Sequence, residues 1–327
     1  MSLNELAQVC GVSGYEKEVR ALIRRLAEPY ADGMQEDALG NLLVTKRGTG
    51  ANPQTIMLAA HMDEIGLQVT KIEDSGMVRV KMLGSVWIPT AYQSRVTFRN
   101  GTAGIVASSV RPEDVKTDFT KLYVDIGATS REDARKYVDI GDVACFDGAY
   151  REFANSIVSV KALDDRIGCH ILLETLKALK QTTDHVVFAF TVQEEVGCRG
   201  SRVAAERVQP DIGVSVDVTP AHDRPGDLEG SNALGEGVAI KISDTSVICD
   251  EDLVGEFIGL CREKDIPFQK EVLYVGGTDA SSMNLSNQGV RAAGISVVTR
   301  YTHGPNAMVH MGDVAAAIAL LTAWLGK

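Results

Sequence analysis

The sequence predicts an α/β fold in which a mixed, largely parallel sheet is sandwiched by helices and carries an inserted antiparallel β-barrel-like domain. Three observations lead to this class. Short apolar runs recur along the chain, helical stretches lie between them, and residues 68–156 follow a different, partly alternating pattern. Strands covered on both faces are apolar nearly throughout, and strands that alternate with helices favour an open sheet with helices on both faces.

The individual elements follow from periodicity. A first helix is expected within 15–30, where apolar residues recur at helical spacing and Pro29 marks the end. A helix at 164–180 begins with two acidic residues and closes with two lysines, as the helix dipole favours. Further helices are expected at 250–264 and 313–325, and strands at 55–60, 185–190, 212–216, 237–242 and 294–298.

Residues 68–156 interrupt this alternation. They contain short segments, several of them alternating between apolar and polar residues, separated by Gly, Asn, Asp and Pro. This pattern is typical of antiparallel strands in a small barrel or sandwich. We therefore expect one domain built from 1–67 and 157–327, with 68–156 inserted into it as a β domain.

Composition excludes several classes of function. The chain has 327 residues and a net charge of −11, which argues against nucleic acid and anionic membranes as partners. No apolar run approaches the roughly 20 residues of a membrane-spanning helix. The first residues show no secretory signal pattern, and the six cysteines are scattered without a CxxC pair. We therefore expect reduced thiols in a cytoplasmic protein.

Histidines and acidic residues gather near the ends of the expected strands. In open α/β sheets, sites form at the carboxyl ends of the strands. Imidazoles mixed with carboxylates, without thiolates, are typical ligands of zinc, for which cobalt or manganese can substitute. The candidate residues are His61 and Asp63 after 55–60, Asp164 at the start of 164–180, Glu194 and Glu195 after the strand at 185, Asp217 after 212–216, and His303 past 294–298.

Counting charges favours two metal ions over one. Two divalent ions bring four positive charges against the three negative charges of Asp164, Glu195 and Asp217, whereas a single ion leaves a net negative charge that hinders activation of water. Two ions about 3.5–4 Å apart need a shared ligand. An aspartate at the start of a helix is short and fixed enough to be that ligand.

Eight segments of the chain form a recognisable series: GVSGYEKEVR, DALGN, AAHMDEIGLQV, KALDDRIG, VQEEVGCRGS, SVDVT, GGTDA and TRYTHGP. They resemble segments of the tetrahedral (TET) and glutamyl aminopeptidases, a family of dinuclear zinc metallopeptidases. The resemblance runs from end to end, in the family's order, and includes the inserted domain. It implies a cytosolic metallo-aminopeptidase that removes N-terminal residues from peptides, with 68–156 as the dimerisation domain and six dimers in a dodecamer.

The resemblance also assigns roles to the metal ligands. It makes Asp164 the ligand that bridges two divalent ions, with zinc as the expected metal, and it places a cis peptide bond after Asp164. His61 and Asp217 then complete one metal site, and Glu195 and His303 the other.

Two further roles come from the same source. Asp63 is expected to orient the imidazole of His61 through a hydrogen bond, and Glu194 to be the general base. Neighbouring residues in extended backbone point opposite ways, so the spacing alone leaves open which glutamate is the ligand. The sequence departs from the family at Asp165, Thr302 and Gly304, none of which is an expected ligand.

Other residues and functions offer alternatives to this site and activity. His310 is the alternative to His303, whereas His170, His185 and His222 are expected to be packing or surface residues. Gly276 and Gly277 lack the residues of a phosphate-binding loop and are expected to let backbone approach the substrate. Cys169 and Cys198 lie in no nucleophile motif. The alternative functions are a metal-dependent carboxypeptidase, deacylase or glycanase on the same scaffold, and a catalytically silent assembly protein. The sequence leaves the preferred N-terminal residue open.

Overall fold

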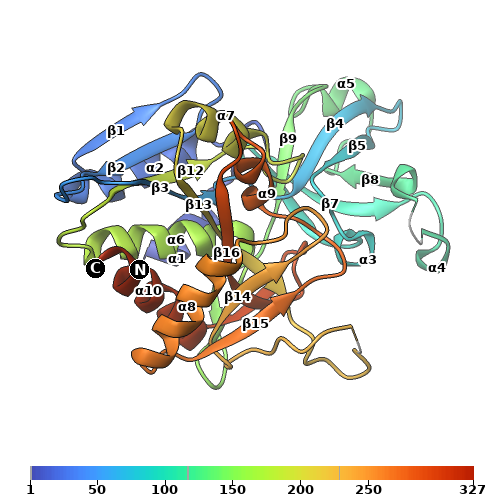
Figure 1. The fold of residues 1–327 in the computed structure, drawn as a ribbon. Helices are drawn as coiled ribbons and strands as arrows, with labels where there is room; N and C mark the ends of the chain where they lie inside the picture. The colour runs from blue at the N-terminus through green and yellow to red at the C-terminus, as the bar shows by residue number, and fades with distance from the viewer. Residues whose placement is uncertain (1, 116–117, 228) are drawn as a thin grey trace.

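The structure, a computed structural model, describes residues 2–115, 118–227 and 229–327. It contains an eleven-stranded mixed sheet covered by helices and a closed six-stranded antiparallel barrel, which confirms the predicted fold class (Figure 1). Among the described residues, no helix is both long and apolar enough to cross a membrane.

The centre of the large sheet is parallel, whereas its flanks are antiparallel. β12, β3, β13 and β16 lie side by side and run in one direction. The sheet order is β1-β2-β12-β3-β13-β16-β17-β11-β10, and β14 pairs with both β15 and β16. The strands are β1 Gly33–Glu36, β2 Leu42–Lys46, β3 Thr55–His61, β10 Arg151–Glu152, β11 Ile157–Val160, β12 His185–Thr191, β13 Ile212–Pro220, β14 Val238–Ser243, β15 Phe268–Val272, β16 Arg291–Arg300 and β17 Ala307–His310.

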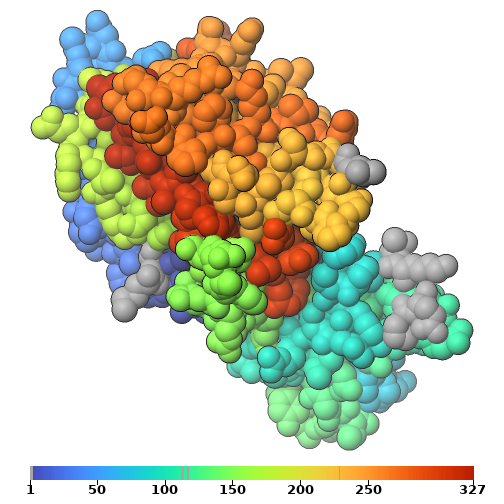
Figure 2. Space-filling model, turned by 90° about the horizontal axis from the view of Figure 1, so that it is seen from below, coloured from blue at the N-terminus to red at the C-terminus, as the bar shows by residue number. Residues whose placement is uncertain are grey.

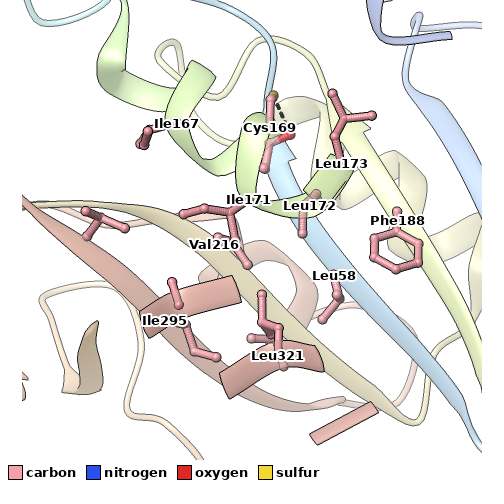
Figure 3. Packing of buried hydrophobic residues seen from close by; sticks show 14 of the residues in the cluster. Leu58, Ile167, Cys169, Ile171, Leu172, Leu173, Phe188, Val216, Ile295 and Leu321 are labelled. Atoms are coloured by element: carbon pink, nitrogen blue, oxygen red, sulfur yellow. Dashed lines mark hydrogen bonds between the residues drawn. The ribbon is translucent and has the colours of Figure 1, made fainter. Parts of the chain in front are cut away.

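Helices cover both faces of this sheet because its central strands are apolar on both sides. In β3, Leu58 belongs to the large core cluster with α6 and α10, while Met57 and Ala59 pack with residues of α7 and α9 on the other face. Figure 3 shows Leu58 and Phe188 near Leu172 of α6. The helices of this domain are α1 Ser2–Gln8, α2 Lys17–Ala27, the 3₁₀ turn Glu28–Tyr30, α6 Leu163–Ala178, α7 Arg199–Val208, α8 Glu251–Glu263, α9 Asp279–Asn284 and α10 Met311–Leu325.

The barrel forms a second lobe with its own core (Figure 2). It closes in the order β4-β5-β8-β7-β6-β9, and the chain rejoins the large sheet at β10. The exact domain limits stay a prediction. The barrel contains β4 Gly66–Ile72, β5 Val78–Leu83, α3 Ile88–Ala91, β6 Arg95–Phe98, β7 Ala103–Ser108, α4 Pro112–Val115, the 3₁₀ turn Phe119–Lys121, β8 Leu122–Asp125, α5 Arg131–Ala134 and β9 Val143–Phe146.

Two local expectations need correction. Asp217 does not follow its strand but lies within β13, because pairing with β16 continues to Pro220. Asp164 and Asp165 do not begin the regular helix, because both have non-helical φ and ψ angles at the start of α6. The peptide bond between them is cis, as the resemblance implies.

The expectation of six reduced cysteines is also wrong for one pair. Cys10 and Cys145 form a disulfide with their Cα atoms 5.9 Å apart, although 135 positions separate them in sequence. The barrel strand β9 packs against the segment after α1, where Val12 and Cys145 share a small apolar cluster. Sequence spacing carries no information on this contact between domains. The other four cysteines are free.

Candidate active site

The candidate metal ligands meet at the carboxyl ends of the central parallel strands. His61 is the last residue of β3, Asp217 lies near the end of β13, and His303 follows β16. Glu194 and Glu195 lie in the loop after β12. Together with Asp164 these residues line one cavity of about 450 Å³. The structure therefore brings together the whole expected ligand set and the expected base.

Asp164 lies between the two histidines. Its Oδ1 is 3.1 Å from His61 Nε2, and its Oδ2 is 3.3 Å from His303 Nε2. Asp164 belongs to two clusters of possible metal ligands, and within each cluster the ligand atoms lie within 4.8 Å of one another. One cluster is His61, Asp164 and Asp217, and the other is Asp164, Glu195 and His303. The carboxylate of Asp164 is common to both.

Asp63 is buried behind the cavity and contacts both sides of the site. The Nδ1 of His61 lies 3.0 Å from the Asp63 backbone carbonyl and 3.4 Å from its Oδ1. The carboxylate also accepts hydrogen bonds from the backbone N–H groups of Glu194 and Glu195 and from the hydroxyl of Ser13. Asp63 thus fixes the imidazole mainly through its own carbonyl, and its carboxylate positions the two glutamates.

The backbone around the cavity adopts unusual conformations. Gln193, just before the two glutamates, has a φ of +55°, and His303 has a φ of +57°. Ala162, before Asp164, and Cys198, after the glutamates, are also in the left-handed region. Such conformations are uncommon for residues other than glycine and cluster at functional sites. They allow loop residues to aim their side chains into the cavity.

Burial and mutual repulsion perturb the acids of the site. Burial, with the negative charge of Asp164, raises the pKa of Glu195 to about 8 and that of Asp217 to about 7. Burial also raises the pKa of Glu194 well above its usual range, and the charges of Asp217 and Asp279 add to the shift. Against the effect of burial, the hydrogen bond and charge of Asp164 raise the pKa of His303 to about 9.

The donor set fits divalent cations. Carboxylates removed from water without a cation are costly, and here four buried or half-buried ones share one cavity with two imidazoles. The Oε1 atom of Glu195 is buried and has no hydrogen-bond partner within the described residues. Carboxylate and imidazole ligands suit zinc, manganese or cobalt. A buried carboxylate oxygen without a hydrogen-bond partner, placed among other carboxylates, fits the role of a metal ligand.

Residues beyond the predicted set support the site. Asp279, which begins α9, is buried and accepts hydrogen bonds from Thr191 and Ser201. Glu16 accepts a hydrogen bond from the backbone N–H of Gln193. Burial, with the charge of Asp63, raises the pKa of Glu16 to about 7. Both acids lie in segments that resemble the aminopeptidase family, and this resemblance was the one sequence signal that could have indicated their role. No spacing rule pointed to them.

A buried ion network underlies the loop after β3. Lys161 donates to both carboxylate oxygens of Glu64 at 2.8 Å, and Arg166 lies 3.3 Å from the same carboxylate. Arg166 is completely buried. Its guanidinium also donates to the backbone carbonyls of Leu6, Val9 and Met62. The arginine therefore ties α1 and the His61 loop to α6.

The alternative residues lie elsewhere. His310 accepts a hydrogen bond from the backbone N–H of Gly312, and within the described chain it does not line the cavity. His170, His185 and His222 are likewise absent from the described lining. Burial raises the pKa of the Cys169 and Cys198 thiols well above the usual range, which disfavours a thiolate nucleophile.

The fold and this cluster of imidazoles and carboxylates define a hydrolase of the metal-dependent peptidase class. A sequence profile of the M42 glutamyl aminopeptidase family matches residues 40–320. A putative aminopeptidase of Acetivibrio thermocellus is 41% identical over 98% of this chain and 96% of its own length.

Solved structures agree. An aminopeptidase of the archaeon Desulfurococcus kamchatkensis has a TM-score of 0.95 and 34% identity over 99% of this chain and 93% of its own. The TET1 peptidase of Pyrococcus horikoshii has a TM-score of 0.88 and 31% identity over 100% of this chain and 98% of its own. That peptidase can assemble into a tetrahedron or a large octahedral shell. The chain belongs to the M42 glutamyl aminopeptidase family and is a metallo-aminopeptidase.

Proposed function

We propose that this aminopeptidase works through a dinuclear metal site, in which Asp164 is shared between two divalent ions. His61 and Asp217 hold one ion, and Glu195 and His303 hold the other. The single observation that carries this proposal is the position of Asp164, whose two oxygens contact different imidazoles and which belongs to both ligand clusters. Zinc is the ion that this ligand set favours, with cobalt or manganese as substitutes.

Glu194 is the proposed general base. Its Oε2 lies in the cavity, 3.9 Å from His61 Nε2, and its backbone is held by Asp63. Divalent ions held by these residues would supply polarisation of the scissile carbonyl and a lower pKa for the attacking water. The Glu194 carboxylate then takes a proton from the attacking water and delivers it to the leaving amine. A neighbouring acid or the metal would hold the free α-amine of the peptide and restrict cleavage to the N-terminal residue.

An anilide assay tests the exopeptidase activity. The metal-loaded enzyme should release the chromophore from an aminoacyl anilide and leave its N-acetylated twin intact, because only the first has a free amine. Treatment with a chelator should abolish the activity and added divalent metal should restore it. Equal release of the chromophore from both anilides would show that a free amine is not required and would contradict the exopeptidase activity, and activity that survives complete metal removal would refute metal dependence.

We also infer a homo-oligomer in the cytoplasm, assembled from dimers that pair through the barrel. The barrel supports this role because it presents exposed apolar side chains, among them Ile105, Tyr137 and Ile140. A related TET1 peptidase crystallised as a dodecamer and can assemble into a tetrahedron or a large octahedral shell, which supports a dodecamer of six dimers as the expected form. Disulfides such as Cys10–Cys145 are rare in reducing compartments. A count of free thiols on protein from freshly lysed cells would show whether this disulfide is formed in the cell, and so whether the compartment is reducing or oxidising.

A further inference from the structure

We propose that the cavity accepts a neutral, aliphatic N-terminal side chain and discriminates against peptides that begin with glutamate or lysine. This inference rests on the proposed aminopeptidase function and names its substrate class. It also departs from the glutamyl preference in the family's description.

The wall opposite the ligand cluster is uncharged. Among the described residues that line the cavity there is no lysine or arginine, and its acids are the four of the proposed metal and base set. The remaining wall is built from apolar side chains, including Val218, Leu273 and Val275, and from small hydroxyl residues such as Ser246. A side chain that enters this part of the cavity meets carbon and hydroxyl groups.

Two cations that lie close in sequence to cavity-lining residues are already paired. Lys241, which precedes the loop of Ser246, is completely buried and contacts Glu271 and Asp244. These two carboxylates therefore balance the positive charge of Lys241. Arg300, at the end of β16, donates two hydrogen bonds to the carboxylate of Asp223. Neither side chain is available to a glutamate side chain of a substrate.

The acids in and beside the cavity also have other roles or partners. Asp164, Glu195 and Asp217 are the proposed metal ligands, and Glu194 is the proposed base. Asp279 is buried and accepts hydrogen bonds from two hydroxyl groups. A lysine side chain would therefore find no free carboxylate on the wall. Burying a charged group without a partner is costly, so the wall should penalise glutamate and lysine and tolerate leucine or methionine.

The wall has a defined conformation. The carboxylate of Asp244 accepts hydrogen bonds from the backbone N–H groups of Ser246 and Val247, which holds that loop in a turn. In a second segment Leu273 and Val275 line the cavity, whereas Tyr274 between them does not. Val275 and Tyr274 are similarly exposed, at 70% and 74%. This alternation supplies a matched pair of positions for mutation.

A panel of p-nitroanilides tests the preference. We expect kcat/KM for the leucine substrate to exceed that for the glutamate and lysine substrates by at least about tenfold, and inhibition by the free amino acids to follow the same order. A glutamate or lysine substrate that matches or exceeds leucine would overturn this inference and leave the aminopeptidase function standing. Failure of all free-amine substrates, alanine and methionine included, would instead refute the proposed function.

Two arginine variants test the wall directly. Val275→Arg adds a cation to the cavity and should raise the ratio of glutamate to leucine hydrolysis at least about tenfold. Tyr274→Arg adds the same charge at the neighbouring position, which does not line the cavity, and should leave the ratio of glutamate to leucine hydrolysis unchanged. Both positions are exposed, so both variants should fold. An unchanged ratio in Val275→Arg, or an equal rise in both variants, would show that this wall does not select the side chain.

Discussion

Asp164 is the residue on which the proposed mechanism depends, and Glu194 and Glu195 are the pair that best separates metal binding from proton transfer. The contacts place Glu195 with His303 and Asp164, whereas Glu194 lies on the side of His61 and Cys198. Adjacent glutamates thus face different parts of the cavity, and they should respond differently to the same conservative substitution.

Substituting each glutamate by glutamine tests this difference. Glu195→Gln removes a charged ligand, so metal content and activity should fall together. Glu194→Gln leaves the ligand set intact, so the metal should stay while kcat falls by about 10²–10⁴-fold. Elemental analysis and steady-state kinetics on both variants provide the check. Metal loss in Glu194→Gln with retention in Glu195→Gln would reverse the two roles.

Metal affinity should depend on pH in a defined direction. Without metal, Glu195 has a pKa of about 8 and His303 a pKa of about 9, so both hold protons at neutral pH. A divalent ion must displace these protons. The apparent affinity for zinc should therefore rise from pH 6 to pH 9, with protons released on binding. Calorimetry in buffers of different ionisation enthalpy measures this release, and an affinity independent of pH would contradict it.

At the scale of elements, four parallel strands place the site at one edge of the sheet. His61 ends β3 and Asp217 lies near the end of β13, and the loops of Glu195 and His303 follow β12 and β16. Periodicity and the rule that sites lie at strand carboxyl ends predicted this arrangement, because β3, β12, β13 and β16 are long apolar runs. The same reasoning could not place the limits of β13, which depend on its pairing with β16. It also missed the support from Asp279 and from Arg166, because those contacts join segments far apart in sequence.

Arg166 offers a test of how the elements are held together. Arg166→Met would remove the buried donor to the backbone carbonyls of Leu6, Val9 and Met62 and leave Lys161 as the one cation on Glu64 among the described residues. We therefore expect a loss of about 3–5 kcal/mol in the free energy of unfolding. The exposed pair of Arg25 and Glu5 is the control, since Arg25→Met should cost at most about 1 kcal/mol. Chemical denaturation compares them, and equal small losses would show that the buried network contributes little.

At the scale of the whole molecule, the barrel has two roles in this account. It completes one wall of the cavity, because Ser85 lines it and a Cβ at Gly84 would lie 2.9 Å from Glu195 Oε2. It is also the proposed surface for pairing of subunits. The disulfide between Cys10 and Cys145 links the two domains, and it would hold this wall against the catalytic domain.

Charged substitutions on the barrel test the assembly. Ile140→Glu places a charge on a side chain that is 60% exposed in the single chain, so it should block pairing and leave smaller species in light scattering. Tyr30→Glu, on the surface of the large domain, is the matched control and should keep the assembly mass of the unmodified protein. If Ile140→Glu also keeps that mass, the barrel face around this residue is not the interface.

The number of metal ions in the active enzyme tests the central claim most directly. Enzyme reconstituted with zinc, freed of excess metal by gel filtration and shown to have full activity should contain two ions per chain by elemental analysis. Activity should reach its maximum only as the second ion binds. Full activity with one tightly bound ion per chain, or with none, would contradict a site in which Asp164 is shared between two metals.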